Sequence, residues 1–242
     1  IHFNLNAEFQ TKMEVEEHMR KSIKHKHMLT ICNPRDTTKS PPKPFHTSRL
    51  LQVASNILHI SPSETMRLCQ QLYQTGYITY MRTESTKYAK PFIQEISKYI
   101  QEEYGSEKYI GDVEELENKQ ANNPHEAIRV TQLSNKTIAS DDARLASMYK
   151  LIWKNTIESC MSEAKYKAIP LEVSGVEKTK YTYTHEIPIF LGWKVVSDKK
   201  LDTNTQNEAN GLHMFFKTQL SKPIKYNWIE SLVSMKNKHS HY

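Results

Sequence analysis

The chain has 242 residues, of which 38% are hydrophobic and 25% are charged, and these fractions are ordinary for a globular protein. No apolar run approaches the roughly 20 residues of a membrane-spanning helix, and three scattered cysteines without a CxxC pair argue against a disulfide framework or a zinc site. The formal net charge of +6 suits a polyanionic partner, although charge alone is weak support for one.

Alternating apolar residues at the start of the chain predict a β-strand. In residues 1–10, Phe3 and Leu5 alternate with polar neighbours, which is the period of a half-buried strand. A second strand is expected near residues 28–32. Residues 1–40 are therefore predicted to form the first part of a β domain.

One helix is predicted within this β domain, and a linker is predicted after it. Thr11 and Glu14 match the T-x-x-E pattern of a capping box, which marks a helix start. Residues 33–46, NPRDTTKSPPKPFH, are rich in proline and basic side chains. Such a composition is typical of a linker.

Residues 41–168 are predicted to form a helical domain. A first helix is expected to begin at Thr47 or Ser48, since either residue can cap it. Ser61 opens a second helix through the string SPSE, which combines a capping pattern with proline at the first helical position. Gly76 is suited to end that helix.

The pattern after these two helices resembles a winged helix. A strand predicted at residues 77–81 would supply the wing of such a DNA-binding module. Further helices are predicted over residues 88–104 and 141–161. Residues 102–118 contain seven acidic residues and one lysine, so they are predicted to be a solvated loop.

Strand-like alternation returns near the end of the chain. Leu171 and Val173 alternate with other residues, as does Tyr181 with its neighbours, and two more strands are expected within residues 211–235. Residues 169–242 are therefore predicted to be the return part of the β domain. The fold class predicted from these patterns is α+β, with a helical domain inserted into a β domain.

The most informative string is GYITYMRTES at residues 76–85. In an extended strand, residues two positions apart share a face, so Tyr80 and Arg82 are expected to lie together. A phenol needs positive charge or a base to act as a nucleophile at neutral pH, and a guanidinium can hold a phosphate. For an isolated Tyr-x-Arg pair, packing plus a surface charge is the commoner explanation, so the wider string must decide.

That wider string resembles the active-site motif of type IA DNA topoisomerases, usually GYITYMRTDS. Upstream, PFHTSRL at 44–50 resembles the family's P-F-x-T-S-x-L, and TMRLCQQLY at 65–73 resembles T-M-x-x-A-Q-x-L-Y. Downstream, HEAIR at 125–129 equals the family's H-E-A-I-R, and YKLIW at 149–153 resembles L-Y-x-L-I-W. The five segments follow the family's order and cover residues 41–166.

The resemblance implies a role for each matching residue. Tyr80 would be the catalytic nucleophile, forming a 5′-phosphotyrosyl link to one DNA strand, freeing a 3′-hydroxyl and resealing without ATP. Arg82 and His125 would act beside it on the scissile phosphate and bind DNA. Arg129 and Arg49 would contact the DNA backbone. The implied enzyme is a type I DNA topoisomerase that changes DNA topology by cleavage, strand passage and religation.

The resemblance also implies an architecture. The winged-helix-like domain that carries the catalytic tyrosine (41–168) would be inserted in a β-strand arch domain (1–40 and 169–242). The chain contains no D-x-D pair, so the family's Mg²⁺ would be held by an N-terminal, toprim-type metal-binding domain of the same polypeptide that is absent here. We therefore expect a central fragment, inactive alone, with no metal site of its own.

The remaining expectations concern partners and branch. The expected partner is single-stranded DNA, and no membrane is expected to be involved. The protein is expected to be an intracellular monomer, in the cytoplasm or the nucleus. Glu84 stands where the family usually has aspartate, Val130 replaces a proline, and Met81 fits the topoisomerase I branch. The sequence is closest to bacterial-type topoisomerase I, with a viral homologue as one candidate, and the topoisomerase III and reverse gyrase branches stay open. The alternative function is a non-enzymatic winged-helix module that binds duplex DNA with Tyr80 merely packed.

Overall fold

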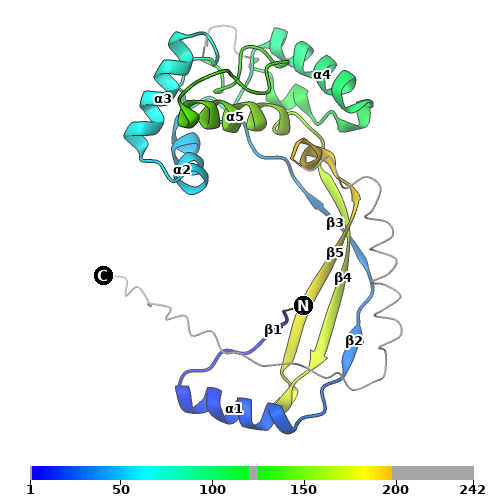
Figure 1. The fold of residues 1–242 in the computed structure, drawn as a ribbon. Helices are drawn as coiled ribbons and strands as arrows, with labels where there is room; N and C mark the ends of the chain where they lie inside the picture. Colours follow the sequence, from blue (N-terminus) through cyan, green and yellow to red (C-terminus); the bar gives the residue numbers. More distant parts are fainter. Residues whose placement is uncertain (1, 120–124, 198–242) are drawn as a thin grey trace. The chain divides into compact units, whose positions relative to one another are not determined.

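The computed structural model describes residues 2–119 and 125–197 (Figure 1). These residues form helices and an antiparallel sheet, so the predicted mixture of helices and strands is confirmed. The two strands predicted within residues 211–235, and with them much of the predicted β-domain return, lie outside the described residues. Within the described part of the chain, no helix is both long and apolar enough to cross a membrane.

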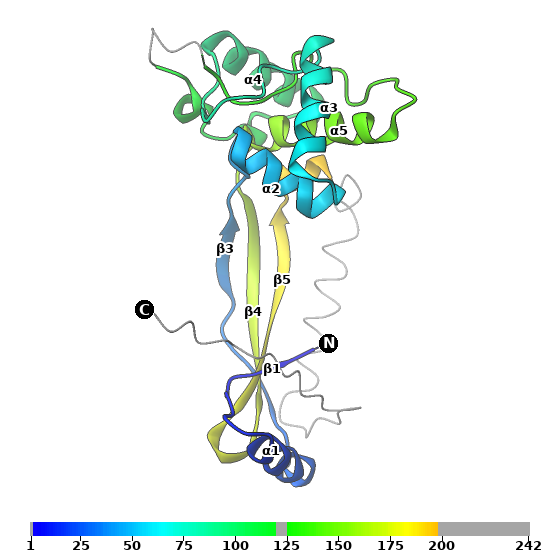
Figure 2. The same ribbon diagram turned by 90° about the vertical axis from the view of Figure 1, so that its left-hand side faces the viewer.

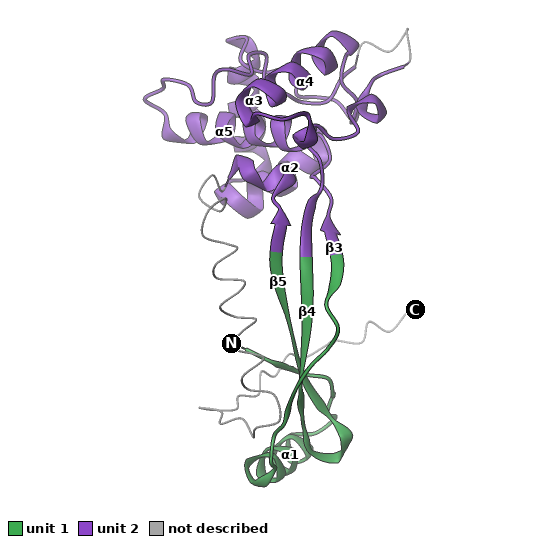
Figure 3. Cartoon of the chain, turned by 90° about the vertical axis from the view of Figure 1, so that its right-hand side faces the viewer, with its two compact units in different colours: residues 1–36, 167–187, 204–242 green, residues 37–166, 188–203 purple. Residues whose placement is uncertain are grey.

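The chain divides into two compact units, which Figure 3 colours separately. Of the described residues, unit 1 contains 2–36 and 167–187. Unit 2 contains 37–119, 125–166 and 188–197. Each unit is built from segments that are far apart in the sequence.

The sheet has five strands, with order β1-β5-β4-β2 and β3 also paired with β4. In chain order they are β1 (Asn4–Leu5), β2 (Leu29–Ile31), β3 (Arg35–Lys39), β4 (Ala164–Ser174) and β5 (Lys180–Phe190). Asn4 lies opposite Thr182, and Leu29 lies opposite Val173, in antiparallel pairs. Figure 2 shows β3, β4 and β5 side by side. The apolar cluster of unit 1 is formed by Leu29, Ile169, Leu171 and Val173.

Helix α1 (Lys12–Lys24) begins at the predicted capping box. The hydroxyl of Thr11 accepts a hydrogen bond from the backbone of Glu14, and the carboxylate of Glu14 accepts one from the backbone of Thr11. Two backbone N–H groups that have no partner within the helix, those of Thr11 and Glu14, are thereby satisfied. This is how the local pattern sets a helix start. The prediction from sequence is confirmed here.

Two predictions for the β regions are wrong in part. Only Asn4–Leu5 of the strand expected over residues 1–10 is paired as a strand, although side-chain burial alternates along it. The linker expected over residues 33–46 contains β3, which pairs with β4. The sequence of β3, RDTTK, includes two β-branched threonines that suit a strand, and the prolines of the segment lie outside it, Pro34 before it and the others after it.

Unit 2 is mainly helical. Its α-helices are α2 (Thr47–Leu58), α3 (Pro62–Gln74), α4 (Lys90–Tyr104) and α5 (Ala143–Glu158), joined by the 3-10 helices η1 (Glu107–Tyr109), η2 (Val113–Leu116) and η4 (Gly192–Val196). A further 3-10 helix, η3 (Val176–Lys178), belongs to unit 1. Helix α5 packs against α2, α3 and η4, and one apolar core runs through the unit.

The acidic segment 102–118 is not simply a solvated loop. It contains η1 and η2, and its apolar side chains Tyr109 and Val113 are buried in the core. Most of the seven acidic side chains in the segment are exposed. The charge count in this segment therefore concealed a short apolar pattern that anchors it to the rest of unit 2.

Candidate active site

The segment that carries Tyr80 begins at the end of α3. The amide of Tyr77 donates to the carbonyl of Leu72, and the amide of Gly76 donates to that of Tyr73, both at 2.9 Å. This pair of bonds is a Schellman motif, which satisfies the last carbonyls of a helix. Gly76 has φ of 75° with open space around a Cβ position, so glycine is favoured there by backbone conformation alone.

The wing strand predicted at residues 77–81 is wrong. Ile78 forms an isolated antiparallel bridge with Val130, supported by a bond from the amide of Thr79 to the carbonyl of Arg129 at 2.9 Å. Beyond this bridge the chain leaves its neighbour and is held by the N-terminus of α2. The pairing is thus too short to form a strand.

Thr47 is the residue that holds the next part of the segment. Its amide donates to the carbonyl of Thr83 at 2.8 Å, and its hydroxyl lies 2.8 Å from the carbonyl of Met81. The amide of Thr83 donates back to this hydroxyl at 2.9 Å. Met81 and Thr83 are buried, whereas Tyr80, just before Met81, and Arg82, between the two, are exposed. The clamp therefore turns the side chains of Tyr80 and Arg82 outward.

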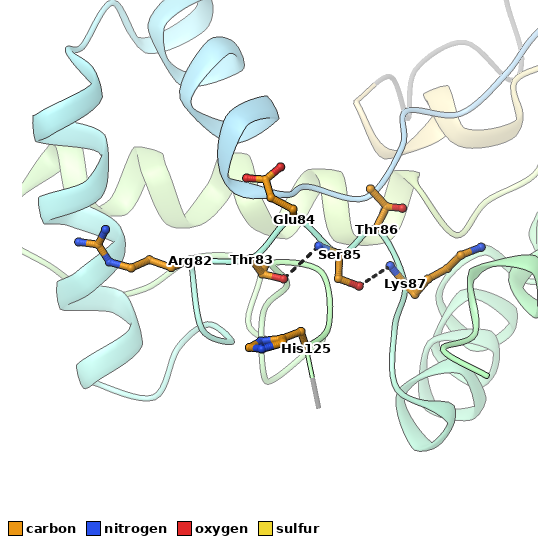
Figure 4. A pocket seen from close by; sticks show the side chains of 7 residues that line it. All are labelled: Arg82, Thr83, Glu84, Ser85, Thr86, Lys87 and His125. Carbon is orange, nitrogen blue, oxygen red and sulfur yellow. Dashed lines mark hydrogen bonds between the residues drawn. The ribbon is translucent and has the colours of Figure 1, made fainter. Parts of the chain in front are cut away.

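A polar pocket of about 540 Å³ lies beside this segment (Figure 4). Its lining consists of Arg82, Thr83, Glu84, Ser85, Thr86, Lys87 and His125. The amide of Ser85 donates to the hydroxyl of Thr83, and the amide of Lys87 donates to the hydroxyl of Ser85. In Figure 4 the side chain of Arg82 extends away from the other labelled side chains. The pocket offers cationic and hydroxyl groups that suit an anion.

Glu84 makes contacts that the sequence did not predict. Its carboxylate accepts a hydrogen bond from Nδ1 of His46 at 2.8 Å and one from the hydroxyl of Ser48 at 3.2 Å. His46 is the residue just before α2, where it gives the helix no side-chain cap. The pair therefore ties the pocket rim to the start of α2. The sequence offered one sign of this contact, namely His46 within PFHTSRL together with glutamate instead of aspartate at position 84.

The HEAIR string contains an internal ion pair and forms an isolated bridge from Ile128 to Phe45. Nε and Nη2 of Arg129 each donate to the carboxylate of Glu126 at 3.0 Å. The guanidinium also lies 4.1 Å from the centre of the Phe92 ring, and the Arg129 side chain is only 15% exposed. The backbone amide of Ala89 donates to the same carboxylate at 3.3 Å. Arg129 is thus engaged inside unit 2, while His125 at the start of the string is exposed.

Exposure separates Tyr80 from most other tyrosines of the chain. Burial raises the pKa of Tyr88 well above its ordinary value, and burial raises the pKa of Tyr149 to about 12. Among the described tyrosines, only Tyr73 and Tyr80 have exposed side chains, at 41% and 43%. Their ring centres are 5.2 Å apart at an interplanar angle of 65°. Tyr73, at the end of α3, had no predicted role.

The structure brings some of the predicted site residues together. Arg82 and His125 line the same pocket, and Tyr80 is two residues before Arg82. Arg49, in the first turn of α2, is exposed and donates to the side chain of Gln52 at 2.6 Å. Tyr80, Arg49 and Arg129 are not among the residues that line the pocket.

The buried cysteines of unit 2 are structural in character. Burial raises the pKa of the Cys69 thiol to about 12, and burial likewise raises that of Cys160 to about 12. Neither thiol is therefore suited to act as a nucleophile or a metal ligand.

Comparison with known proteins gives matches over most of the chain. A family model described as DNA topoisomerase matches residues 3–229. A protein of Acanthamoeba polyphaga mimivirus named DNA topoisomerase 1 type prokaryotic is 37% identical over 165 residues, or 66% of this chain. DNA topoisomerase 1 of Escherichia coli is 32% identical over 166 residues, or 67% of this chain. In both cases the match spans 19% of the relative's length.

A solved structure also resembles this one. Full-length topoisomerase I of Thermotoga maritima superposes with a TM-score of 0.61 and 27% sequence identity. The match covers 84% of this chain and 34% of the Thermotoga chain.

Proposed function

This chain belongs to the DNA topoisomerase family, in its bacterial type IA class, and we propose that Tyr80 is the nucleophile of a transient single-strand DNA cleavage. The observation that carries the proposal is the exposed phenol of Tyr80, held two residues before Arg82, whose side chain lines a polar, cationic pocket. The chain spans about a fifth of the relatives' length. The reaction, its substrate and its partners are therefore proposals for the whole protein.

The reaction exchanges one phosphodiester for another. The phenolic oxygen of Tyr80 attacks the phosphorus, loses its proton to solvent, and forms a phosphotyrosyl bond to the 5′ side of the break. The bond from phosphorus to the 3′-oxygen breaks, and that oxygen takes a proton to become a hydroxyl. Resealing is the reverse reaction, and no ATP is needed because one ester bond replaces another. Passage of DNA through the open break would change its topology.

Each predicted site residue has a part in this proposal. The guanidinium of Arg82 and the imidazole of His125 would hold the phosphate and its developing charge. Arg49 is assigned to the DNA backbone because its side chain is exposed. A direct DNA contact by Arg129 stays a prediction, and it would require the bond to Glu126 to open. While it is paired with Glu126, Arg129 would help to hold the segment that follows His125 in place.

We also propose the wider architecture on family grounds. Residues 41–168 would be the winged-helix-like, tyrosine-carrying domain, and residues 1–40 and 169–242 would form the β arch. Among residues 2–119 and 125–197, no group of three His, Cys, Asp or Glu side chains is placed to hold a metal ion. The Mg²⁺ expected of the family would be held by a toprim-type domain elsewhere in the polypeptide. The whole protein would act inside the cell as a monomer on single-stranded DNA.

A non-enzymatic winged-helix module is less well supported. Helices α2 and α3 are in tandem, but the residues expected to form the wing are irregular and present Tyr80 outward. A duplex-binding module would leave Tyr80 packed, which is not its environment here. Stronger binding to duplex than to single-stranded DNA would favour this alternative.

The polarity of covalent capture tests the proposed reaction. The chain would be mixed with the metal-binding domain of a relative, Mg²⁺ and a single-stranded oligonucleotide labelled at either end, then denatured. A 3′-end label should become attached to the protein, and a 5′-end label should be released on a shorter strand. Tyr80→Phe should abolish attachment, and Tyr77→Phe is the matched control. Transfer of the 5′-end label would contradict the proposal.

A further inference from the structure

Two exposed tyrosine rings in contact form an aromatic surface, and one of them, Tyr80, is two residues before the pocket residue Arg82. Tyr73 lies in the last turn of α3, and its ring meets that of Tyr80 edge to face, 5.2 Å between centres. The other large apolar side chains that are exposed in the described residues lie on α1, α2 and β5: Met13, Ile23, Ile57 and Ile189. Single exposed apolar residues need no explanation, whereas an exposed contacting pair points to a ligand.

The local backbone fixes this aromatic surface in advance. The carbonyl of Tyr73 accepts the amide of Gly76, inside the motif that ends α3. From there the chain runs through the Ile78–Val130 bridge to the buried Met81, so both neighbours of the Tyr80 ring are anchored. A ligand that stacks on a surface already in place loses less conformational entropy on binding.

We propose that Tyr73 is a nucleobase-stacking residue, which binds an unpaired base of the strand whose phosphate lies at Arg82. The proposal rests on the proposed function, which places a nucleic acid strand in the pocket. Two residues of extended chain span at most about 7 Å, so Tyr80 and Arg82 can meet neighbouring parts of one strand. Any base can stack on an aromatic ring, and only a single strand presents unpaired bases to do so.

The charge around the ring pair suits the same ligand. Arg82, Lys87 and His125 line the pocket and can face phosphates, although the ammonium of Lys87 also binds the carbonyl of Glu115. The aromatic surface then supplies a contact for the base, which these cationic side chains do not provide. Binding to the chain should therefore depend on the bases as well as on the phosphates.

Fluorescence anisotropy with two labelled strands of equal length tests the inference on the unmodified chain. One strand is oligothymidylate, and the other has an abasic site at every position, so the phosphate charge is the same. The chain should bind oligothymidylate about five- to a hundred-fold more tightly. Tyr73→Leu should lose this preference, whereas Tyr73→Phe should keep it. Gln71→Ala, an exposed change on the same turn, should leave both affinities unchanged.

Three results would overturn the inference. They are an unmodified chain that binds both strands equally or not at all, a Tyr73→Leu variant that keeps the preference, and a variant that weakens both strands equally. The last would indicate disturbed structure rather than lost stacking. A base preference in this assay, combined with no adduct at Tyr80 in the capture assay that includes the metal-binding domain and Mg²⁺, would leave the stacking site standing and refute the proposed nucleophile, so the two failures are distinguishable.

Discussion

Arg129 donates two hydrogen bonds of 3.0 Å to the carboxylate of Glu126, three residues before it, in the segment that follows His125. The pair is largely buried, with the side chains 15% and 20% exposed, and Phe92 covers the guanidinium. Removal of either partner leaves the other with an unsatisfied charge. Because Phe92 and the amide of Ala89 also contact this pair, it ties the segment to the start of α4.

Glu126→Ala should destabilise the chain by about 2–4 kcal/mol, because it leaves the Arg129 guanidinium unpaired in a mostly buried position. Urea unfolding measures this change. Glu102→Ala is the matched control, since Glu102 pairs with Lys98 at 3.8 Å on the surface. It should cost less than about 0.5 kcal/mol. Equal losses of unfolding free energy in the two variants would mean that the pair of Glu126 with Arg129 stabilises the chain no more than a surface ion pair does.

Thr47→Val should release the segment next to Tyr80. The variant keeps the shape of the side chain but loses the hydroxyl that accepts the amide of Thr83, at a cost of about 1–2 kcal/mol. The amide of Thr83 should exchange its hydrogen faster, as measured by NMR. Thr47→Ser keeps the hydroxyl and should keep the protection. Unchanged exchange in Thr47→Val would show that the clamp is unimportant.

Gly76→Ala and Gly105→Ala form a matched pair of tests. Both glycines end a helix with positive φ, 75° and 74°, and neither has a neighbour within 4 Å of a Cβ. Each alanine should cost about 1 kcal/mol in the free energy of unfolding. Only Gly76→Ala should also weaken oligothymidylate binding, because Gly76 directs the chain towards Tyr80. Equal binding by the two variants would argue against that directing role.

Local patterns gave the starts of α1 and α3, and distant pairings explain much of what they missed. For α2 the expected cap, Thr47 or Ser48, is wrong, because the residue at the cap position is His46, which makes no side-chain cap. The Thr11 capping box and the Ser61 cap lie within four residues of their partners, so the sequence shows them. The outward position of Tyr80 depends on Thr47 and Val130, which are more than 30 residues away. The pattern of residues 77–81 predicted a wing strand, because a sequence pattern does not show how far the pairing with another segment extends.

The sequence predicted which residues belong to the candidate site better than it predicted how those residues are arranged. The family motif named Tyr80, Arg82 and His125, and the last two do line one pocket. The spacing of Glu126 and Arg129 did not predict their ion pair, because residues three apart are neighbours on a helix and this segment is not helical. The exposed contact of Tyr73 with Tyr80 required the three-dimensional path of the chain.

Glu158 should make the stability of the chain depend on pH. Burial raises the pKa of this carboxyl from 4.5 to about 7, with partial relief from Lys154 and Ser197. A raised folded pKa means that the native state binds the proton more tightly, so stability should fall as pH rises from about 4.5 to about 7. The loss is on the order of 2–3 kcal/mol. Glu158→Gln should lack this component in urea unfolding across that range, and parallel pH profiles for the two proteins would refute it.

The most direct test of the account is to identify the residue that becomes linked to DNA. The whole protein that contains this sequence would be incubated with single-stranded DNA and Mg²⁺, denatured and digested, and the nucleotide-bearing peptide sequenced by mass spectrometry. We predict the adduct on Tyr80, within the peptide that contains GYITYM, joined to a 5′-phosphate. An adduct on any other residue, or one joined through a 3′-phosphate, would contradict the central claim.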